Sequence, residues 1–229
     1  MIFDGHSDIF SDVRYKREAG ETQVLKNHHL DRLRKGGIGG ACFVIWADTY
    51  NGHAPKDEME AIVKGIKGEM AETKEFVLIH NVEELKAAEA AGKFAILLGI
   101  EGLAGIGEDL SKIDELYDLG ARHAMLTWNE ENALATGVKG DPNRGVTELG
   151  KQAIQKLQEK KMILDVSHIN EKSFWDVIDL ATGPILASHS NAKALASAAR
   201  NLTDDQLRAI RDTNGLVGLN AFGDFISDN

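Results

Sequence analysis

The sequence predicts an α/β protein of the (β/α)8 TIM-type barrel class, on the basis of two patterns. Apolar runs punctuated by glycine alternate along the 229 residues with longer charged amphipathic stretches, as in repeated strand–helix units with a parallel sheet. The phosphate-binding glycine motif that would follow the first strand of an open doubly wound sheet is missing. Because only seven main strands can be counted, we expect a barrel whose eighth strand is absent from this sequence.

Each expected element follows from its local pattern. Apolar runs predict strands at 1–8, 41–46, 94–100, 124–128, 162–168, 184–189 and 215–222, with a short additional strand at 76–79. Apolar residues at helical spacing, bounded by N-caps such as Thr147 and Thr203 and by closing glycines such as Gly92, predict helices at 30–35, 56–74, 82–91, 110–119, 147–160, 171–181 and 203–213. Residues 10–27 and 129–146 are polar and irregular, so we expect loops there.

Composition narrows the class of protein. A net charge of −10 argues against nucleic acid or an anionic membrane as the partner. The single cysteine, Cys42, excludes an intrachain disulfide and a cysteine-based zinc cluster. With no apolar run long enough to span a bilayer and no signal peptide before the first strand, we expect a cytoplasmic protein. Neither a linker nor a repeat interrupts 1–229, so we expect one metal-dependent hydrolase barrel domain, C-terminally incomplete.

Five side chains that can bind metal follow the expected strands. They are His6, Asp8, Glu101, His168 and His189. In a (β/α)8 barrel the active site lies at the C-terminal ends of the strands, so these groups meet at one rim. Three histidines and two carboxylates exceed the needs of one tetrahedral zinc, which predicts a two-metal site with a bridging carboxylate. The other histidines, at 28, 29, 53, 80 and 123, are expected to be structural, with His123 at the entry end of its strand.

The order of short motifs points to a known family. The motifs are Asp4-Gly5-His6-Ser7-Asp8, Gly99-Ile100-Glu101-Gly102, Asp165-Val166-Ser167-His168, Ser188-His189-Ser190 and Ala199-Arg200-Asn201, supported by residues 33–40 and 126–129. Together they resemble the membrane (renal) dipeptidase family of zinc metallopeptidases, in a bacterial-type member. The resemblance runs from residue 1 to about residue 225.

The resemblance implies a dipeptidase that cleaves the peptide bond with a water bridging two zinc ions. His6 and Asp8 would bind one zinc, His168 and His189 the other, and Glu101 would bridge both. Glu101 and Asp8 would serve catalysis, whereas Arg200, Trp128 and Asn129 would bind the dipeptide, with Arg200 on its terminal carboxylate. The partner is then a small dipeptide, and a homodimer is left open.

Two departures from the family pattern and two alternatives accompany this interpretation. Trp128 stands where mammalian members have a substrate-contacting histidine, and the aspartate that ends the family's eighth strand has no counterpart. We therefore expect these residues to be part of a longer chain.

One alternative is another amidohydrolase-type barrel acting on a lactam, ester or N-acyl amino acid. Against it, His6-Ser7-Asp8 stands in place of the His-x-His motif of that class, and Glu101 stands in place of its carbamylated lysine. The other is an inactive metal-binding barrel fragment.

Overall fold

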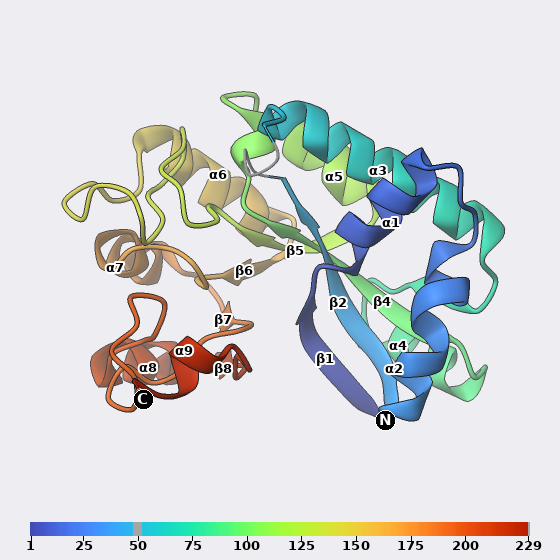
Figure 1. The fold of residues 1–229 in the computed structure, drawn as a ribbon. Helices are drawn as coiled ribbons and strands as arrows, with labels where there is room; N and C mark the ends of the chain where they lie inside the picture. The colour runs from blue at the N-terminus through green and yellow to red at the C-terminus, as the bar shows by residue number, and fades with distance from the viewer. Residues whose placement is uncertain (48–51, 229) are drawn as a thin grey trace. The chain divides into compact units, whose positions relative to one another are not determined.

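The computed structural model describes residues 1–47 and 52–228. These residues form two compact units (Figure 1), one made of 1–100 and 115–122 and the other of 101–114 and the residues from 123 onward. The single-domain organisation expected from the sequence stays a prediction.

The first unit contains the N-terminal strands. They are β1 (Ile2–Ser7), β2 (Ile38–Trp46), β3 (Phe76–Leu78) and β4 (Phe94–Glu101), the last residue of which belongs to the second unit. The order in the sheet is β1-β2-β4, with β1 parallel to β2 and β3 parallel to β4. Three phenylalanine rings form the centre of the core: Phe43 meets Phe10 edge-on with centroids 5.4 Å apart and stacks on Phe94 at 5.6 Å.

Helices cover this sheet. They are α1 (Ile9–Glu18), a π-helical segment η1 (Leu25–Leu30), α2 (Asp31–Lys35), α3 (Pro55–Glu72), α4 (Val82–Ala90) and α5 (Lys112–Leu119), the last of which is divided between the units. Helix α1 packs on α3 (Figure 1). The fully buried carboxylate of Glu69 on α3 accepts hydrogen bonds from the backbone N–H groups of Val24 and Leu25, at 3.0 and 2.9 Å, and so anchors the start of η1.

The prediction of a loop at 10–27 is wrong, because α1 occupies its first half and η1 begins at Leu25. The inner face of α1 has few apolar residues: Phe10 and Val13 are buried beside Arg14, whose guanidinium lies 3.1 Å from the carboxylate of buried Glu58 on α3. A helix whose buried face includes a paired arginine shows little apolar periodicity, so its signal in the sequence is weak.

The second unit contains the C-terminal strands. They are β5 (Ala121–Met125, with its first two residues in the first unit), β6 (Ile163–Asp165), β7 (Ile185–Ala187) and β8 (Leu216–Val217). They pair in parallel in chain order. The helical segments are the 3-10 turn η2 (Ala104–Ile106), α6 (Glu148–Glu159), α7 (Glu171–Leu180), α8 (Asp204–Asp212) and α9 (Gly223–Ile226). The expected N-caps are confirmed: the Thr147 hydroxyl accepts from Gly150 N, and Thr203 forms a reciprocal capping box with Gln206.

The strands of this unit differ in extent from the apolar runs. Strand β5 lies earlier than 124–128, so His123 is inside the strand and not at its entry end. The apolar pattern does not predict this shift, because His123 is a fully buried polar residue whose Nε2 contacts Asp165 on the neighbouring strand. Strands β6, β7 and β8 are shorter than the apolar runs, because the residues that follow them leave the sheet and turn. Helix α9 was not expected.

The predicted fold class is confirmed. Seven main parallel strands, with β3 as the additional one, alternate with helices along the chain as in a (β/α)8 barrel, and an eighth main strand is absent from the residues described. Among the same residues, no helix combines the length and the apolar character needed to cross a bilayer.

Candidate metal centre

The end of β1 presents two of the expected ligands. His6 and Asp8 are two residues apart, so their side chains project to the same side, and His6 Nε2 lies 3.7 Å from Asp8 Oδ1. Asp8 is at the N-cap position of α1, yet its side chain makes no capping hydrogen bond. The first unit thus has an imidazole and a carboxylate side by side at a strand end.

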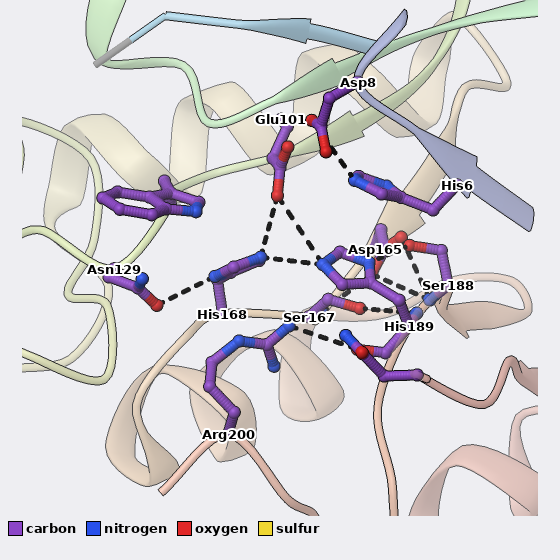
Figure 2. Close-up of polar contacts among 12 residues, drawn as sticks. His6, Asp8, Glu101, Asn129, Asp165, Ser167, His168, Ser188, His189 and Arg200 are labelled. Carbon is purple, nitrogen blue, oxygen red and sulfur yellow. Dashed lines mark hydrogen bonds and ion pairs between the residues drawn. The ribbon is translucent and has the colours of Figure 1, made fainter. Parts of the chain in front are cut away.

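Three further expected ligands converge in the second unit (Figure 2). Glu101 ends β4 and is 3% exposed, whereas His168 and His189 follow β6 and β7. Oε1 of Glu101 lies 2.8 Å from His168 Nε2 and 3.6 Å from His189 Nε2, and the two Nε2 atoms are 2.8 Å apart. Two imidazole nitrogens and a carboxylate oxygen therefore meet at one point.

The outer nitrogen of each imidazole has its own partner. His168 Nδ1 lies 2.9 Å from Asn129 Oδ1, and His189 Nδ1 lies 2.8 Å from Ser188 Oγ (Figure 2). Because an amide oxygen only accepts, the proton of His168 is placed on Nδ1, and Nε2 keeps its lone pair. Metal-binding histidines commonly donate their second N–H in this way.

The electrostatics also suit a cation. Burial lowers the pKa of His168 to about 3, since desolvation and the positive Arg200 outweigh the neighbouring Glu101 carboxylate. A neutral imidazole is the form that binds metal. Lone pairs this close repel one another unless a proton or a cation lies between them, so the donor set fits a divalent metal such as zinc.

Backbone geometry directs two of these side chains. His168 has φ +75°, a region that is unusual for a residue other than glycine, and its carbonyl accepts from Val138 N at 2.9 Å. Gly102, directly after Glu101, has φ +85°, and a Cβ there would lie 2.7 Å from Trp128 N. The chain therefore needs glycine where it turns after Glu101.

Arg200 lies beside the cluster. It is 7% exposed, its Nη2 donates to the carbonyl of His189 at 3.2 Å, and its Nε–H has no hydrogen-bond partner among the residues that the structure describes. Burial lowers its pKa to about 10, against the opposing effect of Glu101 and Asp165. The guanidinium stays charged at neutral pH, and an anion beside it would satisfy the remaining donor.

The two other expected substrate-binding residues lie on the chain after β5. The Trp128 ring is 5.9 Å from the His168 ring, and the ammonium of Lys139 lies 5.7 Å from the Trp128 ring centre. Asn129 contacts His168 through its side chain, so its observed contact orients an expected metal ligand.

Sequence reasoning assigned no role to the polar residues behind the histidines. Asp165 and Ser188 belong to the motifs that indicate the family, but only the structure shows that they contact His123 and His189. The sequence feature that could have indicated a supporting role for Asp165 is its position at the end of an apolar strand, three residues before the expected metal ligand His168.

The fold and the donor cluster together define a metal-dependent hydrolase of the (β/α) barrel class. Residues 1–229 match the model of the membrane dipeptidase family, peptidase family M19, and the chain belongs to this family. The recognition made from the sequence motifs is confirmed.

Individual relatives agree with this assignment. An uncharacterized protein in the PQQ-III 3' region of Acinetobacter calcoaceticus is 31% identical over 96% of this chain and 79% of its own length. A metallopeptidase from Rhodobacter sphaeroides, solved with a phosphinate mimic of the dipeptide L-Ala-D-Ala, superposes with a TM-score of 0.90 at 27% identity, over 99% of this chain and 75% of that one. A solved dipeptidase AC of family M19 gives a TM-score of 0.87 at 27% identity, over 98% and 74%.

The chain is thus a hydrolase of the metal-dependent dipeptidase class, as expected from the motifs. Neither alternative is favoured by these matches. An amidohydrolase from Pseudomonas aeruginosa is 19% identical with a TM-score of 0.74, and this likeness reflects the shared barrel fold alone.

Proposed function

We propose that this protein hydrolyses dipeptides with two zinc ions per chain. The observation that carries the proposal is the convergence of Glu101 Oε1 with the Nε2 atoms of His168 and His189, all separated by 2.8 to 3.6 Å. Membership of the dipeptidase family supports it. Mixed nitrogen and oxygen donors of this kind favour zinc among common divalent ions.

The proposed ligands divide into two sets. His168 and His189 would hold one zinc, His6 and Asp8 would hold the other, and Glu101 would bind both. Zinc at such a site polarises a carbonyl and lowers the pKa of bound water toward neutrality. Glu101 and Asp8 would serve catalysis by supplying the negative charge that balances the two cations.

Substrate recognition is assigned to the residues around this cluster. Arg200 binds the terminal carboxylate of the dipeptide with the donor that has no partner in the described residues. Trp128, whose ring lies 5.9 Å from the His168 ring, and Asn129, which acts through His168, complete the proposed substrate site. The dipeptide mimic bound by the Rhodobacter sphaeroides relative supports a short substrate with a free carboxylate.

Two further features are part of the proposal. We propose that the protein is cytoplasmic and that it can form a homodimer. We also propose that neither nucleic acid nor a membrane is among its partners. The net charge of −10 supports the exclusion of anionic partners. Fractionation of the native cells and light scattering of the purified protein test these points.

The direct experiment is a hydrolysis assay on a panel of dipeptides, with protein stripped by a chelator and then reconstituted with zinc. We expect activity only after reconstitution, and only on dipeptides with a free C-terminal carboxylate. A matched control uses the C-terminally amidated form of each dipeptide. Hydrolysis that is equally fast in the stripped protein, or hydrolysis of a lactam or ester but not of any dipeptide, would contradict the proposal.

A further inference from the structure

Asp165 lies at the centre of the polar contacts behind the candidate metal centre. It ends β6, is 1% exposed, and its Oδ2 lies 2.7 Å from Nε2 of the fully buried His123 on β5. Oδ1 accepts from Ser167 N at 2.7 Å, and both oxygens accept from Ser188 N at 3.3 and 3.2 Å. A single carboxylate thus joins the middle of β5 to the turns that follow β6 and β7.

The backbone groups that Asp165 holds directly precede the two histidines of the cluster. Ser167 comes before His168, and Ser188 comes before His189 (Figure 2). The two turns are also joined to each other, because His189 N donates to Ser167 Oγ at 3.3 Å. A displacement of the Asp165 carboxylate would therefore move both imidazoles.

The conformation of His168 shows why such support is needed. A non-glycine residue at φ +75° has a strained backbone, which persists only where its surroundings fix it. The hydrogen bond from Ser167 N to the side chain of Asp165, two residues earlier, fixes the turn that leads into this conformation. His123 in turn contacts the other oxygen of this carboxylate, Oδ2.

We propose that Asp165, held by His123, is the positioning residue of the metal centre: it fixes the turns before His168 and His189 so that both Nε2 atoms converge beside Glu101. This inference rests on the proposed function, since it concerns the residues proposed to hold zinc. Asp165 binds no metal itself in this account and acts only through Ser167 and Ser188.

The test measures metal affinity by competition with a chromophoric chelator, together with the visible spectrum of the cobalt-substituted protein. Asp165→Asn keeps the shape but loses part of its acceptor capacity, and we expect zinc affinity to fall about 10- to 100-fold with a changed cobalt spectrum. Glu69→Gln is the matched control. It removes the charge of another buried carboxylate that accepts two backbone N–H groups, and we expect its zinc affinity to stay within about twofold of wild type after correction for any unfolded protein.

If Asp165→Asn does not fold, a second pair of variants tests the same inference through His123. His123→Leu removes the donor to Asp165, whereas His123→Gln keeps an N–H donor at that position. We expect weaker zinc binding in the leucine variant and partial recovery in the glutamine variant, which a loss of packing alone would not produce. Wild-type affinity and an unchanged cobalt spectrum in Asp165→Asn and His123→Leu would overturn the inference. Failure of the wild-type protein to bind zinc at all would instead overturn the proposed function.

Discussion

His168 Nδ1 lies 2.9 Å from Asn129 Oδ1, and this contact leaves the lone pair of His168 Nε2 directed at Glu101. The amide oxygen thereby selects the tautomer that can bind a metal. Asn129 precedes His168 by 39 residues and lies in a polar segment after β5. Its position shows how the loops after the strands support ligands that the strand ends supply.

The first prediction concerns this support. Asn129→Leu removes the acceptor, so His168 can take the other tautomer, and we expect zinc affinity to fall by roughly 10-fold or more. Chelator competition measures the loss. Asn143→Leu, in an exposed turn of the same segment, is the control. If Asn129→Leu raised KM for dipeptides while zinc affinity stayed at the wild-type value, Asn129 would be a substrate contact alone.

Gly102 provides a prediction on stability. Gly102→Ala combines a positive φ with a Cβ 2.7 Å from Trp128 N, so we expect it to lower the free energy of unfolding by roughly 1–3 kcal/mol. Two controls separate the causes: Gly107→Ala has φ +58° but no atom within 4 Å, and Gly183→Ala has neither a positive φ nor a close neighbour. Urea unfolding of the three variants should rank Gly102→Ala as the most destabilised. Equal midpoints for Gly102→Ala and Gly183→Ala would show that the turn tolerates a side chain.

The pair formed by Arg17 and Glu72 predicts that the stability of the fold depends on pH. Arg17 donates to Glu72 at 2.8 and 2.9 Å, and this hydrogen bond chiefly lowers the pKa of Glu72 from 4.5 to about 2. A carboxyl whose pKa is lower in the folded state stabilises the fold above its unfolded pKa, and that contribution is lost as pH falls from about 4.5 through 2. Glu72→Gln should therefore be less stable than wild type at pH 7, with the difference shrinking over this range. Urea midpoints as a function of pH measure it, and a difference that grows on acidification would contradict the assignment.

Arg200 carries the prediction on substrate recognition. Arg200→Ala should lose about 2–4 kcal/mol of transition-state stabilisation in kcat/KM, because one partner of a charge-assisted pair is deleted. Its zinc content should be unchanged, which separates recognition of the substrate from binding of the metal. Arg200→Lys should recover only part of the loss, since an ammonium cannot form two parallel hydrogen bonds to a carboxylate. Exposed Arg208→Ala is the control. Wild-type kcat/KM in Arg200→Ala would remove this residue from the substrate site.

Much of the architecture follows from the sequence because strands buried in a barrel are almost continuously apolar. The ends of those runs therefore mark Glu101, His168 and His189, and the rule that barrel sites lie at strand ends predicts that the three side chains meet. The expectation fails at α1, where Arg14 paired with Glu58 takes the place of an apolar residue on the buried face. It also misplaces His123, since a polar residue in the middle of a strand looks like a strand boundary.

The contacts that support the ligands cannot be predicted from one sequence. Asp165 and His123 are 42 residues apart, and no periodicity relates them. The hydrogen bond from Ser167 N to Asp165 is local, but its importance depends on the positive φ of His168. The residue type histidine does not predict this conformation. Polar groups behind a site are therefore identified by geometry, whereas the ligands themselves can be identified by pattern.

Metal stoichiometry in the wild type and in Glu101→Gln tests the central claim most directly. Elemental analysis of protein reconstituted with zinc and freed of excess metal should give two zinc ions per chain. Glu101→Gln should lower occupancy at both sites, because a neutral amide bridges two cations poorly, whereas the exposed Glu108→Gln should keep both ions. A wild-type chain that retains no zinc, or a Glu101→Gln chain that still holds two ions and hydrolyses dipeptides at the wild-type rate, would contradict the account.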